Sequence, residues 1–354
     1  MTENVEKEAT SEDTNAAKDH GVLYIGMDLG TSRTAISASN GVRESMHSVV
    51  GYPKDHIARR VLGKEVLLGQ EAVDKRLSLK FIKPLEKGVL KEDDPDAQRA
   101  AADLIGAAIA MAKPRKDELI YCVIGVPAQA SVHSKEAIIQ AARESVDSVM
   151  LCSEPFAVAY GLDMLDDALV IDIGGGTADL CRLRGTMPEE SDQLTLDVAG
   201  DSVDAELSRL MKEACPGADF SLQMVKNFKE RYSFLGDPPE PVVIDLPVDG
   251  KPTAFDITSQ TKQACSLLVQ PIVDGLQQLI ASFDPEFQHK LRQRVLIAGG
   301  GSMIRGLDTA IEQAMARDLG GGKVIRIEEP IHGGSNGALK IAHDMPEEFW
   351  EDLR

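Results

Sequence analysis

The segment 28–32, Asp-Leu-Gly-Thr-Ser, combines residue types and spacing that suit phosphate chemistry, directly after an apolar run. Gly30 lets the backbone approach an anion closely, and Thr31 and Ser32 can donate hydrogen bonds from amides and hydroxyls to phosphate oxygens. Asp28 could order the water ligands of a Mg²⁺ ion, which usually keeps much of its hydration shell. Taken alone, this motif is better explained as an ordinary hairpin turn.

A stronger candidate is the segment 172–179, Asp-Ile-Gly-Gly-Gly-Thr-Ala-Asp. Successive glycines between apolar strands cost chain entropy and packing, and close approach of the backbone to a ligand explains that cost. A flexible turn would explain the glycines but not Asp172, which occupies the position that corresponds to Asp28. We therefore expect Asp172 to act in catalysis and, mainly through water, in Mg²⁺ binding. The residues of this turn expected to contact phosphate are Gly174, Gly175, Gly176 and Thr177.

Glu154 lies between Ser153 and Pro155, and proline suits the first turn of a helix. Glu154 would then stand at a strand-to-helix junction, where its carboxylate could orient a water molecule for in-line attack on a phosphate. The alternative is an acidic side chain that only stabilises the helix N-terminus. The tripeptide alone favours that alternative.

A third glycine-rich turn precedes a predicted helix and is made of Gly299, Gly300, Gly301 and Ser302. Such a turn can lie flat against the base and sugar of a nucleotide, and the N-terminus of the following helix favours negative charge. No segment of the chain fits the pattern GxxxxGK[ST], so a P-loop is excluded.

The elements that must position these residues repeat along the chain. Segments 22–41 and 168–183 both read as strand, glycine turn and strand, and segments 121–145 and 294–307 both read as strand, turn and helix. We therefore predict two halves of related architecture, each opening with an aspartate-bearing hairpin. Mixed strands and helices in this order indicate a two-domain α/β fold.

Composition and charge limit the function classes. Among 354 residues, 38 Lys and Arg stand against 57 Asp and Glu, and the net charge of −19 disfavours direct nucleic-acid binding. The five cysteines and seven histidines are dispersed without zinc-site spacing, as expected in a reducing cytosol. Residues 1–20 are predicted to form a disordered acidic tail, neither a signal peptide nor a membrane anchor. No apolar stretch reaches the roughly 18 residues of a membrane span, 101–112 being the nearest, so we expect no membrane insertion.

The order of the motifs DLGTS, SEP, DIGGGTAD and GGGSMIRGL resembles that of the actin superfamily of two-domain ATPases. The resemblance covers about residues 22–345 and implies two ribonuclease H-like domains around a central cleft that binds ATP and Mg²⁺. It implies phosphate loops at 28–32 and 172–177 and an adenosine loop at Gly299–Arg305, with Arg305 as its last residue.

The same resemblance assigns roles outside the glycine turns. It places Lys229 and Glu230 beside the ribose of the nucleotide, and Glu154 where the hydrolytic water is positioned. Domain I would then span 21–160, with a subdomain inserted at about 51–95 and the C-terminal helix 335–354 returning to it. Domain II would span 161–334, with an insertion at about 201–260.

Longer segments narrow the resemblance to the magnetosome-associated bacterial actins. These segments are SVVGYPKD (48–55), VIGVPA (123–128), SEPFAVAYGLD (153–163), KERYSFLG (229–236) and AGGGSMIRGL (298–307). That family polymerises with ATP into cytoskeletal filaments in the cytoplasm that align magnetosome organelles. The resemblance implies an ATPase that forms a helical homopolymer and binds adaptor proteins on the magnetosome membrane. Alternatives of the same fold are a cell-shape bacterial actin and a non-polymerising kinase or chaperone ATPase.

Overall fold

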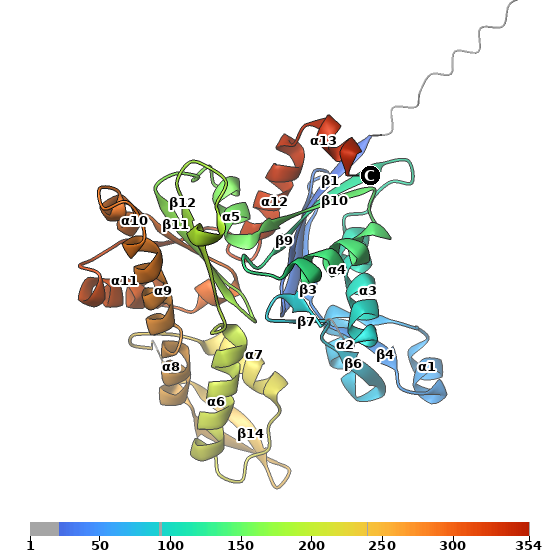
Figure 1. Cartoon of the computed structure of the whole chain (residues 1–354). Coiled ribbons are helices and arrows are strands. Elements are labelled where there is room, and N and C mark those ends of the chain that lie inside the picture. Colours follow the sequence, from blue (N-terminus) through green and yellow to red (C-terminus); the bar gives the residue numbers. More distant parts are fainter. Residues whose placement is uncertain (1–20, 92–93, 239, 354) are drawn as a thin grey trace, which may run out of the picture.

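The computed structural model describes residues 21–91, 94–238 and 240–353. The acidic tail predicted at 1–20 lies outside the described residues. Figure 1 shows two lobes, each with its own sheet, and we call the lobe that contains the first strands domain I and the other domain II.

Domain I is built on a five-stranded sheet. Its strands are β1 (Val22–Leu29), β2 (Arg33–Ala38), β3 (Arg43–His47), β9 (Leu119–Val126) and β10 (Ser148–Ser153). They follow the order β10-β9-β1-β2-β3, with β1 antiparallel to β2 and parallel to β9. β1 therefore lies at the centre of the sheet, which explains its nearly continuous apolar run, because a central strand is covered on both faces.

Domain II repeats this sheet. Its strands are β11 (Ala168–Ile173), β12 (Ala178–Leu183), β13 (Gln193–Leu196), β16 (Val295–Ala298) and β17 (Val324–Arg326). The order β17-β16-β11-β12-β13 has the strand directions of domain I, with β11 antiparallel to β12 and parallel to β16. Asp28 and Asp172 therefore stand near the ends of corresponding strands, and the α/β class is as predicted.

Each sheet is covered by helices that present one apolar face. The main covering helices are α3 (Pro95–Met111) and α4 (Val132–Arg143) on domain I, and α9 (Val269–Ala281) and α11 (Leu307–Asp318) on domain II. α3 begins where it does because the Asp94 carboxylate accepts hydrogen bonds from two amides of the first turn and Pro95 suits that turn. Its buried residues recur every three or four positions from Ala97 to Ile109, so one face packs into the core.

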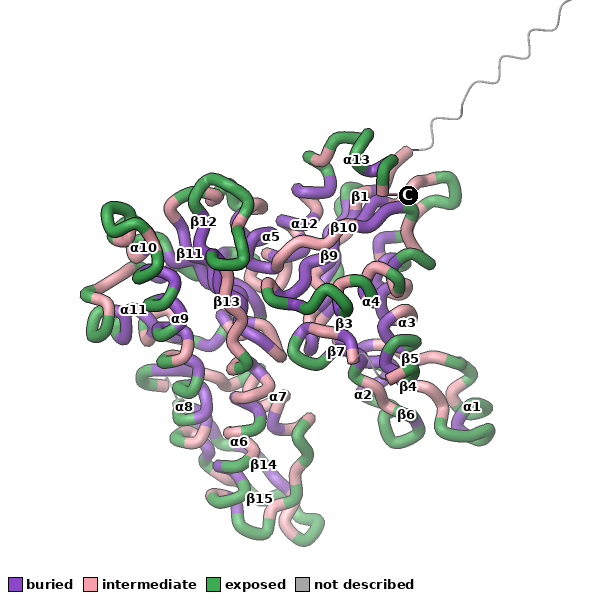
Figure 2. The backbone as a smooth tube through the Cα atoms, in the orientation of Figure 1, coloured by how far each residue is buried: buried purple, intermediate pink, exposed green. Residues whose placement is uncertain are grey.

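Each domain also carries an insertion. The domain I insertion contains β4 (Val50–Pro53), α1 (His56–Leu62), β5 (Leu67–Leu68), α2 (Gly69–Asp74), η1 (Arg76–Ser78), β6 (Leu79–Ile82), β7 (Leu85–Glu86) and β8 (Val89–Leu90). The domain II insertion contains α6 (Gly200–Ala214), α7 (Leu222–Tyr232), the hairpin β14 (Val243–Val248) and β15 (Lys251–Asp256), and α8 (Thr258–Ser266), with α10 (Gln288–Gln293) following α9. Figure 2 shows that the far ends of both insertions, around α1 and β15, are largely exposed.

Two helices cross between the domains. α5 (Glu154–Gly161) follows β10 of domain I but packs against β11 and β12 of domain II. α12 (Gly333–Asp344) follows β17 of domain II but packs against β1 and β9 of domain I. The helices meet through glycines, since a Cβ atom on Gly161 would lie 2.9 Å from the Cα of Gly337. Any change in the angle between the domains must therefore act on the α5–α12 contact.

One helical segment of the described residues, Thr258–Ala281, is long and apolar enough to cross a membrane, judged by length and composition. The stretch 101–112, expected to be the nearest to such a span, was the wrong choice. The segment comprises α8 and α9, and half of its most apolar window is buried. Leu268, Ile272 and Leu276 belong to the core of domain II, so packing accounts for its apolar character.

The glycine contact between α5 and α12 generates a stability prediction. A methyl group at Gly337 would overlap the carbonyl oxygen of Ala157, which is backbone and cannot rotate away. We expect Gly337→Ala to lower the free energy of unfolding by about 1–3 kcal/mol, as overpacking does, measured by urea denaturation. The matched control is Gly106→Ala in α3, whose methyl group would meet only the Ser145 hydroxyl. Equal stability of the two variants would contradict this account of the contact.

Candidate functional site

The two aspartate-bearing glycine turns lie in direct contact across the domains. A Cβ atom on Gly175 would overlap the hydroxyl of Ser32, and one on Gly176 would overlap the hydroxyl of Thr31. Only glycine permits this approach, because any other residue would drive the turns apart. The structure thus brings together the first and second predicted phosphate loops from opposite domains.

Domain I holds the first turn in place through backbone and hydroxyl contacts. The Thr31 hydroxyl accepts a hydrogen bond from the Gly88 amide at 2.6 Å. The Gly30 carbonyl accepts one from the Ser48 hydroxyl at 2.6 Å, and the Gly30 amide donates to the Arg33 carbonyl at 3.2 Å. The turn is therefore set by the core of domain I before any ligand binds.

Four carboxylates gather behind the turns. Asp28 lies near the end of β1 and Asp172 near the end of β11, while Glu154 is the first residue of α5. Asp179 on β12 is the cross-strand partner of Asp172. Glu154, Asp172 and Asp179 are all buried. The strand-to-helix junction predicted for Glu154 is therefore observed, and its carboxylate joins the aspartates of both hairpins.

Burial and mutual repulsion keep these groups from ionising readily. Burial, and next the charge of Asp179, raises the pKa of Asp28 to about 7. Burial also raises the pKa of Asp172 well above its usual range, with Asp28 and Asp179 adding to the shift. The pKa of Glu154 is raised well above its usual range by burial first, and then by its three acidic neighbours. Such a cluster favours a bound cation or retained protons.

The donor set fits Mg²⁺ held mainly through water. It consists of carboxylate oxygens, the ligands that Mg²⁺ prefers. Within the described residues, no group of three or more His, Cys, Asp or Glu side chains is arranged to hold a metal ion. The role expected for Asp28 and Asp172, to hold such an ion mainly through its water ligands, stays a prediction. The first turn of α12 lies close by, since a Cβ atom on Gly334 would be 3.0 Å from the Asp28 carboxylate.

Sequence reasoning assigned no role to Asp179. Its Oδ1 accepts hydrogen bonds from the Ala128 amide at 3.0 Å and the Thr195 hydroxyl at 2.5 Å. Its Oδ2 is buried and has no hydrogen-bond partner among the described residues. The available signal was an acid placed inside a mostly apolar strand, where a buried carboxylate requires a specific reason.

The predicted adenosine loop forms a short turn against the second sheet. Gly299 has a φ of 73° and leaves no room for a side chain beside Asp172, whereas Gly300 faces open space. The turn continues as η3 (Gly300–Met303), and the next helix begins only at Leu307. The Ser302 hydroxyl donates to the Gly299 carbonyl at 2.7 Å, so it stabilises the turn itself.

The other residues assigned to the adenosine side lie around α7. Arg305 is exposed and its Nη2 donates to the Asp237 carbonyl at 3.0 Å. The Lys229 ammonium pairs with Asp204 at 2.9 Å and donates to the Gly200 carbonyl at 2.8 Å. Glu230 is exposed. Lys229 thus fixes the start of α6, whose first two amides donate to the second glycine turn.

Lys226, one helical turn before Lys229, is a further residue that the sequence analysis missed. Its Nζ donates to the Ser32 hydroxyl at 3.0 Å, and that hydroxyl lies 3.4 Å from a carboxylate oxygen of Asp201. Burial is the main cause that lowers the pKa of Lys226. A cation of domain II therefore touches the first phosphate turn of domain I. Its spacing of three residues from Lys229 on one helix was the signal available.

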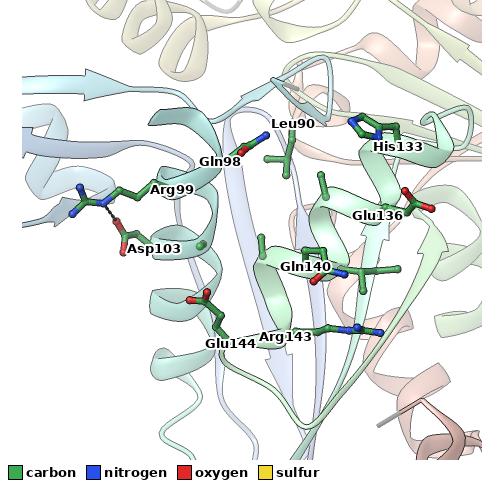
Figure 3. A pocket seen from close by; sticks show the side chains of 13 residues that line it. Leu90, Gln98, Arg99, Asp103, His133, Glu136, Gln140, Arg143 and Glu144 are labelled. Atoms are coloured by element: carbon green, nitrogen blue, oxygen red, sulfur yellow. Dashed lines mark ion pairs between the residues drawn. The ribbon is translucent and has the colours of Figure 1, made fainter. Parts of the chain in front are cut away.

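Two surface hollows lie away from these turns. One of about 950 Å³ lies between α3 and α4, and Figure 3 shows charged and polar side chains such as Arg99, Asp103 and Glu136 around it. The other, of about 490 Å³, is mostly apolar and is bordered by β10, α5 and the end of α12. The candidate site is therefore assigned from the converging turns and carboxylates, and both hollows belong to other surfaces.

Known proteins match this chain over nearly its whole length. The model of the MreB/Mbl protein family matches residues 23–347. The actin-like protein MamK of Paramagnetospirillum magneticum (strain ATCC 700264 / AMB-1) is 38% identical over 343 residues, which cover 97% of this chain and 98% of that protein.

Two solved structures of MamK are also similar to this chain in fold. A MamK double helical filament has a TM-score of 0.89 at 38% identity, covering 92% of this chain and 100% of that chain. A non-polymerising MamK mutant bound to AMPPNP has a TM-score of 0.69 at 38% identity, covering 92% of this chain and 99% of that chain. At equal identity and nearly equal coverage, the present structure is thus more similar to the filament subunit.

The carboxylate cluster predicts an unusual dependence of stability on pH. Burial raises the pKa of Asp172 in the folded chain above its ordinary 3.8, so the unfolded chain loses this proton first as pH rises. The free energy of unfolding therefore falls with rising pH. We expect Asp172→Asn to be more stable than wild type at pH 8, without divalent cations, because the amide carries no charge that burial and the neighbouring carboxylates would oppose. The difference should shrink toward pH 5.

Urea denaturation across this pH range provides the measurement. Asp249→Asn is the matched control, because Asp249 is exposed in a turn far from the cluster, and it should leave the profile unchanged. Added Mg²⁺ should stabilise wild type more than Asp172→Asn at pH 8. Parallel pH profiles for wild type and Asp172→Asn would show that the cluster is not under electrostatic strain.

Proposed function

Because the chain belongs to the MreB/Mbl family of actin-like proteins, we propose that it is an ATP-hydrolysing cytoskeletal protein whose filaments organise magnetosomes into chains. The predicted actin-like fold and the resemblance to magnetosome-associated bacterial actins are confirmed by the family match and by the 38% identity to MamK. The observation that carries the proposal is the direct contact of two acid-bearing glycine turns from opposite domains.

The turns supply the groups that a triphosphate requires. Backbone amides and hydroxyls at 30–32 and 174–177 would bind phosphate oxygens, and the loop 299–305 with Lys229 and Glu230 would hold the adenosine. The AMPPNP-bound MamK mutant, with the same fold, supports ATP as the nucleotide. Bound Mg²⁺ would neutralise phosphate charge, with Asp28 and Asp172 holding it mainly through water.

Glu154 is the best placed residue to orient the attacking water. It begins α5, which packs on domain II, while its side chain lies beside Gly125 at the end of β9 in domain I. Burial raises the pKa of its carboxyl group well above its usual range, and a raised pKa suits proton transfer near neutral pH. Glu154 therefore stands where a change in domain angle would alter hydrolysis.

The surface offers complementary regions for self-association at opposite ends. Val61 of α1 and Leu77 of η1 are apolar yet 78% and 85% exposed. The apolar hollow of about 490 Å³ has Met187 and Phe349 of α13 (Glu347–Asp352) at its border. Figure 1 places α1 and α13 at opposite ends of domain I. A contact between unlike surfaces at opposite ends repeats without closing and produces a filament.

The proposal also includes the location of the filaments and their partners. The filaments would lie in the cytoplasm and bind adaptor proteins on the magnetosome membrane. The support is the resemblance to magnetosome-associated actins together with the MamK matches. Purified magnetosome membranes that fail to co-sediment with assembled filaments would argue against the adaptor.

Substituting the proposed water-positioning residue should separate hydrolysis from assembly. We expect Glu154→Gln to slow phosphate release by at least about 10²-fold, the usual contribution of a positioned acid–base group. Sedimentation with Mg²⁺ and ATP should remain, because the substitution preserves the side-chain shape. Glu144→Gln at the exposed end of α4 is the control and should hydrolyse ATP at the wild-type rate. Unchanged phosphate release by Glu154→Gln would reject this role.

The head-to-tail contact can be tested by mixing two variants. Leu77→Asp places a charge at the α1 end and Met187→Asp places one at the apolar hollow, and neither variant should sediment alone with Mg²⁺ and ATP. Each retains one intact surface, so a mixture should form a dimer of one copy of each, visible by analytical ultracentrifugation. Leu267→Asp, on a separate exposed site, should polymerise normally. Sedimentation of Leu77→Asp alone, or no mixed dimer, would contradict the pairing.

A further inference from the structure

We propose that Asp179 is a positioning residue that ties the loop after β9 in domain I to the second sheet and so sets the spacing of the two glycine turns. The proposal deepens the proposed function, because it rests on ATP being hydrolysed between those turns. Asp179 acts through neighbouring groups and is distinct from the water-positioning carboxylate of Glu154.

The tie begins with two hydrogen bonds to one oxygen atom. Asp179 is fully buried on β12 of domain II. Its Oδ1 accepts from the Ala128 amide at 3.0 Å and from the Thr195 hydroxyl at 2.5 Å. Ala128 belongs to domain I and Thr195 to β13 of domain II, so a single carboxylate oxygen joins the domains. Hydrogen bonds in such a buried place matter for geometry, because a donor left without its acceptor there would cost free energy.

A second pair of contacts closes the network. The backbone amide of Gln129 donates to the Thr195 hydroxyl oxygen at 3.3 Å. The backbone amide of Thr195 donates in return to the side-chain oxygen of Gln129, also at 3.3 Å. The Thr195 hydroxyl therefore donates to Asp179 while it accepts from Gln129. Two consecutive residues of the domain I loop are thus fixed to two adjacent strands of domain II.

The loop leads directly to the first phosphate turn. A Cβ atom on Gly88 would overlap the ring of Pro127, so Gly88 packs tightly on the residue before Ala128. The Gly88 amide donates to the Thr31 hydroxyl at 2.6 Å. On the opposite side, Asp179 is the cross-strand partner of Asp172. A contiguous path therefore runs from the first turn, through the loop, to the aspartate of the second turn.

The remaining oxygen distinguishes Asp179 from an ordinary structural tie. Oδ2 is buried without a partner among the described residues. The charge of Asp179 also raises the pKa of Asp28, Glu154 and Asp172. One carboxylate thus joins the domains through Oδ1 and also acts electrostatically on the other acids of the cluster. Charge in the nucleotide site is thereby linked to the geometry between the domains.

Two substitutions separate the tie from the charge. Asp179→Ala removes both, whereas Asp179→Asn keeps a carbonyl oxygen that can accept from Ala128 and Thr195. Thr195→Val removes the shared hydroxyl without touching the cluster. Asp245→Ala, at an exposed position of β14, is the matched control for an aspartate removed from a strand of domain II.

Amide hydrogen exchange of nucleotide-free protein is the first measurement. In Asp179→Ala and Thr195→Val we expect the Ala128 amide to exchange at least about 10-fold faster than in wild type, because the Oδ1 bond is lost or weakened. In Asp179→Asn and Asp245→Ala its protection should stay near wild type. Because no nucleotide is present, this readout is independent of whether the chain hydrolyses ATP.

Steady-state ATP hydrolysis is the second measurement. We expect kcat of Asp179→Ala to fall at least 10-fold while KM for ATP changes by less than about 3-fold, since misplacing reacting groups costs rate more than binding. Asp179→Asn should recover most of kcat. An Ala128 amide that stays protected in Asp179→Ala would overturn the tie. So would an Asp179→Asn variant as impaired as Asp179→Ala in both measurements, because charge alone would then explain the effect.

Discussion

Repulsion among four clustered carboxylates, three of them buried, is the constraint around which this molecule is arranged. Asp28, Glu154, Asp172 and Asp179 come from β1, α5, β11 and β12, and their pKa values are all raised, with burial as the first cause. Coulombic repulsion in a low-dielectric interior opposes the fold, so the cores of both domains must offset it. A nucleotide that brings a divalent cation would relieve the same repulsion, which makes ligand binding and domain closure parts of one equilibrium.

The crossing helices explain how that equilibrium can reach the whole molecule. α5 begins with Glu154 inside the cluster, and the first turn of α12 lies against Asp28, so each helix starts at the site. Each then packs on the sheet of the opposite domain, and the two meet at Gly161 and Gly337. Cross-domain contacts at Lys226 and Ser32 add to this connection. A displacement at the cluster would therefore act on both helices and on the sheets against which they pack.

The sequence predicted the features that depend on local pattern. Apolar runs ending in an aspartate and a glycine turn identified the hairpins at 28–32 and 172–177, and their repetition predicted paired domains. The start of α5 at Glu154 also followed from the proline beside it. The roles assigned to these residues remain predictions. The support for these roles is the resemblance of the motif order to that of the actin superfamily.

Contacts between residues distant in sequence could not be predicted in this way. The bond from Lys226 to Ser32 joins residues 194 positions apart, and that from the Ala128 amide to Asp179 joins residues 51 apart. Both depend on how the two domains dock, which no local periodicity records. The apolar character of 258–281 was underestimated because polar residues interrupt it on the exposed side of the core helices.

The two hairpins also differ in their acidic residues, so the two domains of the duplicated fold are not equivalent. In domain I the cross-strand partner of Asp28 is Ala35, whereas in domain II the partner of Asp172 is Asp179. Two hairpins like the first would carry one aspartate each and no bond to Ala128, which Asp179 of the second hairpin provides. Because only the second hairpin carries the extra carboxylate, domain II contributes both the additional charge and the bond that holds the loop of domain I. The asymmetry therefore makes domain II the anchor for the loop, so that a change in its acidic pair acts directly on domain I.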